Sequence, residues 1–259
     1  MSQFEAVPRK KRKILITGAA GRVGQVLAQA WADVYDLILV DVAPPPRAGF
    51  IQASAVDIDL LRSLCRGVDT VIPLAISGNL HDDWDTVAPV NLTGTWAAFQ
   101  VAAELGCRRV IFPSSAQTVF NPASPYSASK RWGERLGERY AALTRLSVIC
   151  LRLGSVLPAN APSILPGAGF LDHVITHRDL ARLFTACVEA PETLNYGIFW
   201  GTSANSPGRF DISSARRALG YQPVDDAFQL ARQAGRTPRG LWRMAKSGLK
   251  HRIKKWLNL

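Results

Sequence analysis

The stretch "ITGAAGRVG" (residues 16–24) decides the fold, because it joins an apolar run to a helical pattern through a glycine-rich turn. The preceding "KILITG" (13–18) reads as a buried strand, and "RVGQVLAQAWA" (22–32) has the spacing of a helix. Glycines in such a turn let the backbone approach a pyrophosphate, and the helix directs its first N–H groups at the phosphate charge. The glycines are Gly18, Gly21 and Gly24. The stretch therefore predicts a strand–helix unit that binds a dinucleotide.

The rest of the chain repeats this alternation of strand and helix. Further strands are predicted at 37–42, 70–75, 109–115, 146–154 and 195–201. Helices are predicted near 85–106, 127–144 and 178–189. Apolar strands separated by helices indicate a parallel sheet that is covered on both faces. We therefore expect an α/β fold with a doubly wound parallel sheet of the Rossmann type and a small C-terminal extension on the substrate side.

The charge is concentrated at the two ends of the 259-residue chain, whose formal net charge is +11. Residues 1–13 carry five basic residues against one acid, and residues 232–259 carry nine Lys or Arg and no acid. We expect a basic arm (1–13), a cofactor-binding domain (14–231) with substrate-side elements at about 155–210, and a basic amphipathic tail (232–259). Basic ends without a helix-turn-helix, zinc-finger or RNP pattern do not indicate a nucleic-acid partner.

The cysteines and histidines show no metal-binding or disulfide pattern. The four cysteines are scattered without a C-x-x-C pair, and the four histidines lack ligand spacing. This usage fits a reducing compartment. No apolar run reaches the ~18 residues of a membrane span, and no secretory signal is visible. We therefore expect no metal and a cytoplasmic location.

Asp41 follows the second predicted strand, at the spacing from Gly18 that is typical of the acid that binds the adenosine ribose. A carboxylate there repels the 2′-phosphate of NADP, and no arginine follows it directly in "VAPPP" (42–46). Asp41 therefore favours NAD as the cofactor.

The segment "YSASK" (126–130) has the spacing of a catalytic pair at the start of a helix. Residues four apart share one helical face, so the ammonium of Lys130 is expected beside the phenol of Tyr126. A free tyrosine has a pKa of about 10, so a base near neutral pH needs about 4 kcal/mol of phenolate stabilisation. A lysine cation and a positive nicotinamide both favour the phenolate. Ser115, at the end of the 109–115 strand, is placed to hold the substrate oxygen.

Taken together, "TGAAGRVG", "FPSS", "YSASK" and "LRLGS" resemble the extended short-chain dehydrogenase/reductase family, also called the NAD-dependent epimerase/dehydratase family, over about residues 13–225. The resemblance implies a catalytic triad of Ser115, Tyr126 and Lys130. It also implies cofactor contacts from Gly18, Gly21, Arg22, Val23, Gly24, Asp41, Asp57, Ile58, Leu74, Ala75, Asn91, Lys130 and Leu153. Two of these have a structural alternative, since Asp57 also suits a helix N-cap and Asn91 a helix interior.

Within that family the chain is most similar to the uronate dehydrogenases, in "PLAISG" (73–78), "HRDLARLF" (177–184) and "FWGTSANSPGRFD" (199–211). This likeness implies hydride transfer to NAD from a secondary alcohol or hemiacetal of a sugar or sugar acid. By position, the substrate contacts are Ser77, Gln117, Ser155 and Arg209. The loop 156–170 lacks the arginine with which uronate dehydrogenases meet the carboxylate, and Arg209 or Arg178 are the alternatives.

Two other functions stay open: a nucleotide-sugar epimerase or reductase of the same family, and a non-catalytic NAD-sensing protein, which the presence of Tyr126 disfavours. As partners we expect a small sugar-type substrate and a second copy of the chain. The tail segment 240–259 has an apolar face with Trp242 and Trp256 and basic residues elsewhere. It suits packing on its own domain or on a second subunit, and alternatively peripheral contact with a membrane.

Overall fold

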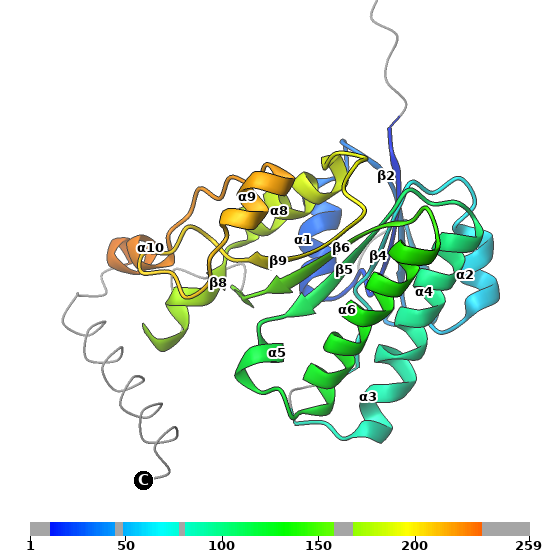
Figure 1. Ribbon diagram of the computed structural model, residues 1–259, viewed down its shortest axis with the longest axis horizontal. Helices are drawn as coiled ribbons and strands as arrows, with labels where there is room; N and C mark the ends of the chain where they lie inside the picture. Colours follow the sequence, from blue (N-terminus) through cyan, green and yellow to red (C-terminus); the bar gives the residue numbers. More distant parts are fainter. Residues whose placement is uncertain (1–10, 45–48, 78–80, 158–167, 235–259) are drawn as a thin grey trace, which may run out of the picture.

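A computed structural model describes residues 11–44, 49–77, 81–157 and 168–234 (Figure 1). Its centre is a seven-stranded, fully parallel sheet in the order β3-β2-β1-β4-β5-β6-β9. The strands are β1 (Lys13–Thr17), β2 (Asp36–Asp41), β3 (Phe50–Gln52), β4 (Thr70–Pro73), β5 (Arg109–Ser115), β6 (Ser147–Leu153) and β9 (Tyr196–Gly201). The chain crosses from β3 over to β4 beside β1, which creates the switch point at which this fold binds ligands. The predicted doubly wound sheet is confirmed.

Helices cover both faces of the sheet, and a hydrophobic core lies beneath each layer (Figure 1). One layer contains α1 (Arg22–Ala30), α8 (His177–Glu189) and α9 (Ser213–Leu219). The other contains α2 (Ile58–Leu64), α4 (Thr93–Glu104) and α6 (Pro125–Leu143). Because both faces are covered, every residue of β5 is buried, which explains why its sequence does not alternate between apolar and polar residues.

The helix predicted near 85–106 is two helices, α3 (Trp84–Asn91) and α4, which meet at Leu92. Pro89 lies inside α3 and removes one backbone donor from it, which weakens the helix near its end. The shorter elements have too few residues to show a period in the sequence. They are α5 (Gln117–Phe120), α10 (Ala227–Gln233), a 3-10 helix η1 (Ala168–His173), and a two-stranded parallel sheet of β7 (Ser155–Val156) and β8 (Val174–Ile175).

Part of the expected N-terminal arm belongs to the folded domain. The Arg12 guanidinium pairs with Asp69 at 2.9 Å and with Glu189 at 3.5 Å, and β1 begins at Lys13. Residues 1–10 of the arm and 235–259 of the tail lie outside the described residues. Within the described part of the chain, no helix is long and apolar enough to cross a membrane. The four cysteines are all buried and free.

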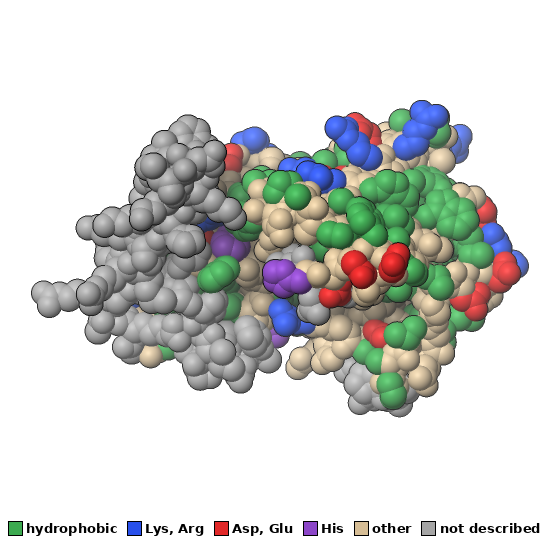
Figure 2. Space-filling view, turned by 90° about the horizontal axis from the view of Figure 1, so that it is seen from below, with side chains coloured by type: hydrophobic (Ala, Val, Ile, Leu, Met, Phe, Trp, Pro, Cys, Tyr) green, Lys and Arg blue, Asp and Glu red, His purple; other side chains and the backbone are tan. Residues whose placement is uncertain are grey.

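Three large tryptophans remain partly exposed on neighbouring helices. Trp84 of α3, Trp96 of α4 and Trp132 of α6 are 47%, 41% and 37% exposed. Figure 2 views the molecule from below and shows apolar side chains gathered on the half of the surface where these helices lie. An apolar patch of this kind is typical of a protein–protein contact surface.

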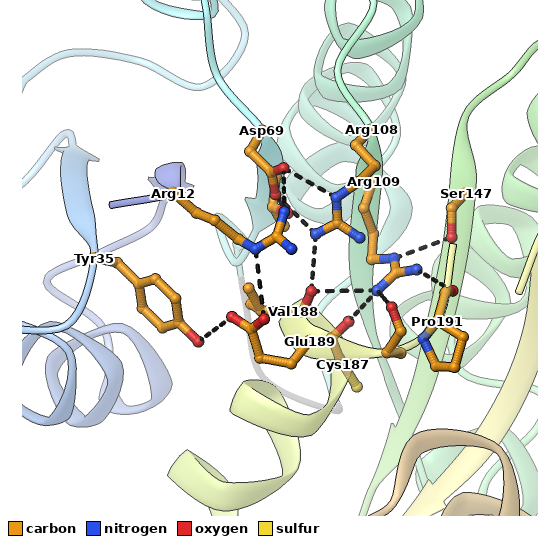
Figure 3. Close-up of polar contacts among 12 residues, drawn as sticks. Arg12, Tyr35, Asp69, Arg108, Arg109, Ser147, Cys187, Val188, Glu189 and Pro191 are labelled. Atoms are coloured by element: carbon orange, nitrogen blue, oxygen red, sulfur yellow. Dashed lines mark hydrogen bonds and ion pairs between the residues drawn. The ribbon is translucent and has the colours of Figure 1, made fainter. Parts of the chain in front are cut away.

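Arg109 is the first residue of β5, at the opposite end of the strand from Ser115. Figure 3 shows its side chain at the carboxyl end of α8. Its guanidinium is fully buried and donates to the carbonyl oxygens of Cys187, Ala190 and Pro191 and to Ser147 Oγ. Burial lowers the pKa of Arg109 to about 10. The side chain supplies hydrogen bonds that the last turn of a helix cannot obtain from its own backbone.

Candidate active site

The site is an elongated cleft at the carboxyl ends of the central strands. Two cavities, each with a volume of about 430 Å³, share the lining residues Gly18, Gly21, Leu74 and Ile76. One extends along β2 and β3, and the other extends toward β5 and β6. Their junction lies between β1 and β4, at the switch point of the sheet. The shape suits a two-part ligand with a bridging group over the glycine turn.

The glycine turn provides a site for the bridging phosphates. Gly18 has a φ of +69°, and a Cβ on it would overlap the backbone of Ala75. The N-cap of α1 is Gly21, which makes no side-chain cap, and the first turn contains no acid. Arg22 and Val23, in that turn, border the cavity. Uncapped N–H groups at a helix N-terminus bind anions, so these residues fit the pyrophosphate of a dinucleotide.

Asp41 lies on the adenosine side of the cleft, at the end of β2. Its carboxylate accepts hydrogen bonds from the backbone N–H groups of Ala20 (2.8 Å) and Ala43 (2.9 Å), so it also holds the glycine turn in place. Asp57 accepts a bond from Leu60 N–H at 3.0 Å as the N-cap of α2. Neither Asp57 nor Ile58 lines the cavity, whereas their neighbours Ser54 and Ala55 do.

The loop after β4 separates the two halves of the cleft. Leu74 lines both cavities, and Ala75 lines the adenosine side. Asn91 lines neither; its Oδ1 accepts from Ser77 N–H at 2.8 Å and its Nδ2 donates to Ser129 Oγ at 3.3 Å. Asn91 therefore ties this loop to α6. Ser77, expected at the substrate, borders the adenosine-side cavity instead.

The three predicted catalytic residues border one cavity, together with Leu153 at the end of β6. Ser115 ends β5, while Tyr126 and Lys130 lie one turn apart at the start of α6. Lys130 is only 4% exposed, and its Nζ lies 5.8 Å from the centroid of the Tyr126 ring. A Cβ on Gly133 would overlap the ring of Phe112, so a glycine there allows α6 to approach β5 closely.

Burial dominates the electrostatics of this triad. It raises the pKa of Tyr126, and a hydrogen bond with Ser115 lowers that pKa only in part. Burial also lowers the pKa of Lys130 to about 8. Burial therefore sets the direction of the shift in the Tyr126 pKa, and Ser115 opposes it in part. A bound positive charge beside the phenol is what would favour the phenolate.

On the substrate side, Gln117 and Ser155 border the cavity and Arg209 does not. The Arg209 guanidinium instead binds Asp172 through two nitrogens, each at 2.7 Å. Arg178, the other candidate for a carboxylate, pairs with Asp225 and is 64% exposed. The structure thus brings together two of the four predicted substrate residues, Gln117 and Ser155.

Several residues in or beside the site, among them His173, Phe120 and Glu134, were not predicted from the sequence. His173 and Phe120 line the cavity from η1 and α5, elements too short to show a pattern. Glu134 is 4% exposed and accepts from Ser114 Oγ (2.6 Å) and from Nε and Nη2 of Arg152 (2.8 and 2.7 Å). These bonds join α6 to β5 and β6. Its spacing of four from Lys130, on the same helical face, is the signal that could have revealed it.

The comparisons with known proteins agree with this geometry. Residues 14–180 match the NAD dependent epimerase/dehydratase family, so the chain belongs to that NAD-dependent family. It is 28% identical over 251 residues to the NAD-dependent glucose-6-phosphate dehydrogenase of Haloferax volcanii, covering 83% of this chain and 94% of the relative. It is 27% identical to the L-arabinose 1-dehydrogenase (NAD(P)(+)) of the same organism, covering 83% and 97%.

A crystal structure of a mutant uronate dehydrogenase from Agrobacterium tumefaciens, complexed with NAD, superimposes with a TM-score of 0.75. The identity is 27%, and the match covers 88% of this chain and 90% of that one. The resemblance to uronate dehydrogenases seen in the sequence motifs is thus confirmed in the fold.

Proposed function

We propose that the protein is an NAD-dependent dehydrogenase that oxidises a secondary alcohol or hemiacetal of a sugar or sugar acid. The observation that carries this proposal is that Ser115, Tyr126 and Lys130 border a cavity that the uncapped N-terminus of α1 also lines. This arrangement sets a hydroxyl-binding group and a base against the cofactor half of the cleft. The relatives that act on glucose 6-phosphate and L-arabinose support the same reaction class.

The chemistry follows from the positions of the three side chains. When bound, NAD supplies the hydride acceptor and a positive charge near Tyr126. Ser115 Oγ holds the reacting oxygen by a hydrogen bond, and Tyr126 Oη takes its proton. Lys130, one turn away on α6, stabilises the phenolate while it is charged. Ser115 and Lys130 are buried and Tyr126 is half-buried, which limits the competition of water for these hydrogen bonds.

The test is a panel of aldoses, uronates and sugar phosphates, monitored by the absorbance of NADH. Net formation of NADH with at least one sugar is expected. A nucleotide-sugar epimerase would restore its cofactor in each cycle, so conversion of a nucleotide sugar without net NADH would favour that alternative instead. Binding of NAD without turnover of any sugar would favour a sensing protein.

We propose further that the chain forms a homo-oligomer through α4 and α6. The partly exposed Trp96 and Trp132 on these helices support this proposal, because burial against a second copy would remove both from water. Light scattering of the wild type is expected to give a multiple of the chain mass. Trp96→Glu with Trp132→Glu is expected to give the mass of one chain, and an unchanged mass would contradict the proposed surface.

Peripheral membrane contact by the basic tail is the alternative to its packing on protein. Only the sequence supports it, through the tryptophans and basic residues of 240–259. The experiment compares the full chain with a chain ending at Ala234, the last described residue after α10. Sedimentation of the full chain alone with anionic liposomes, reduced by salt, would support contact with a membrane.

A further inference from the structure

The cavity that the catalytic triad borders is also lined by uncharged polar and aromatic side chains. Gln117, Ser155 and the ring of Phe120 border it beside His173. Of the described residues that line this cavity, the only Lys or Arg are Lys130, in the triad, and Arg22, at the glycine turn. Residues 158–167, "PANAPSILPG", contain no basic residue in their sequence. Apart from Lys130 and Arg22, the described lining of this cavity therefore offers no permanent cation to an anionic sugar.

Arg209 already binds the carboxylate of Asp172, so it is not placed to bind the carboxylate of a substrate. Both of its bonds to Asp172 Oδ2 are 2.7 Å long, and its backbone N–H donates to the carbonyl oxygen of Asp172 at 2.8 Å. Burial raises the pKa of Asp172, but hydrogen bonds from His173 and Arg209 outweigh burial and lower it overall. Releasing Arg209 toward a substrate would leave this partly buried carboxylate without its main partner, which is costly.

Asp172 also fixes the orientation of His173. The carboxylate Oδ1 lies 2.7 Å from His173 Nδ1, and the ring of Phe120 meets the imidazole edge-on at a centroid distance of 4.8 Å. His173 is 4% exposed and borders the cavity. In the tautomer that donates its Nδ1–H to the Asp172 carboxylate, Nε2 is an acceptor. Among the described residues, no hydrogen bond is formed to Nε2.

We propose that Arg209, Asp172 and His173 form a fixed chain that presents His173 Nε2 to a hydroxyl of the substrate, and that the substrate is a neutral aldose. The inference rests on the proposed dehydrogenase function and names its substrate class. Sugar hydroxyls both donate and accept, so Nε2, Gln117 and Ser155 can satisfy them. A carboxylate or phosphate beside these groups would lose its hydration without gaining a cation. His173 is thus a specificity-determining residue of the site.

Matched sugars test the substrate class. Glucose, glucuronate and glucose 6-phosphate differ only at C6, as do galactose and galacturonate. We expect kcat/KM for a neutral aldose to exceed that of its matched uronate or phosphate by at least about tenfold. A preference for the anionic sugar, or no preference, would overturn this inference and leave the dehydrogenase function standing. Absence of turnover with every sugar, despite NAD binding, would overturn the proposed function and this inference with it.

Two substitutions test the role of Nε2. His173→Asn places an amide near Nδ1 and can keep the bond to Asp172, whereas His173→Gln places a polar group near Nε2. We expect His173→Asn to raise KM for the aldose at least about tenfold, and His173→Gln to retain most of the affinity. The control is His177→Gln, because His177 begins α8 and does not border the cavity.

Titrations of NAD and of a 1,5-anhydro sugar, which lacks the anomeric hydroxyl, accompany the kinetics. Unchanged NAD affinity shows that each variant is folded, and weaker binding of the anhydro sugar by His173→Asn supports a direct contact. Equal KM values for the wild type and His173→Asn, or equal losses in the Asn and Gln variants, would overturn the assignment to Nε2.

Discussion

At the scale of single residues, the candidate site contains an ionisable side chain that is buried. Lys130 is almost fully enclosed, and the ring of Phe112 lies 5.1 Å from its Nζ. Burial lowers its pKa to about 8, which means that the folded protein tolerates the ammonium poorly. A buried lysine ammonium lowers the stability of the folded protein, and such groups are typical of functional sites.

Lys130→Met is therefore expected to stabilise the folded protein without cofactor and to abolish turnover. The pKa of Lys130 is depressed from 10.5 to about 8, so the folded state is disfavoured while the unfolded chain carries the proton. The wild type should be less stable than the variant by about 3 kcal/mol below pH 8, and this difference should vanish above pH ~10.5. Urea unfolding of both proteins at pH 7 and pH 10 measures the effect. A variant that is less stable than the wild type at pH 7 would contradict it.

Asp41 gives a second prediction at this scale, for cofactor choice. Asp41→Ala removes the charge that repels a 2′-phosphate, together with the bonds to Ala20 and Ala43. We expect kcat/KM for NAD to fall and the ratio of NAD use to NADP use to drop by at least about tenfold. Steady-state kinetics with both cofactors measures the ratio. Wild-type protein that used NADP better than NAD would contradict the role of Asp41.

At the scale of elements, the two ends of strand β5 have different roles. Its first residue, Arg109, caps α8, and its last residue, Ser115, borders the cavity of the candidate site. Glu134 holds α6 against β5 and β6 through Ser114 and Arg152. The position of Ser115 relative to Tyr126 therefore depends on polar groups that are buried beside the strand.

Arg109→Met is expected to lower the free energy of unfolding by about 3 kcal/mol or more, because it leaves buried carbonyl groups without donors. Since Arg109 is at the far end of β5, the folded fraction should keep a normal KM. Urea denaturation measures the loss. Arg135→Met is the control: Arg135 is 82% exposed, and its pair with Glu138 should contribute little. Equal stability of the two variants would show that the buried cap is unimportant.

The elements also show how far the sequence predicts this structure. The long strands and α6 are found because buried strands and helices of that length have distinctive periods, and Tyr126 and Lys130 follow from helical spacing. The short β7, β8 and η1 carry no period, so Ser155 and His173 could not be placed together. The partner of Arg209 could not be found either, because Asp172 lies 37 residues away and meets it only in the folded chain.

At the scale of the whole molecule, the two halves of the cleft have separate tasks. The first strands and α1 hold the cofactor side, with the glycine turn and Asp41. The elements from β5 onward supply the triad and the uncharged side chains around His173. The family model covers residues 14–180, so it includes the triad and His173, while Arg209 lies beyond its end.

The central claim is that Tyr126 is the base for hydride transfer to NAD, and Tyr126→Phe tests it most directly. The matched control is Tyr140→Phe on the same helix, whose hydroxyl donates to Gln100 outside the cavity. NAD affinity and the rate of NADH formation with the best aldose are measured on the same samples. We predict that Tyr126→Phe binds NAD normally and loses turnover by at least about a hundredfold, while the control keeps both. Near-normal turnover in Tyr126→Phe would contradict the account.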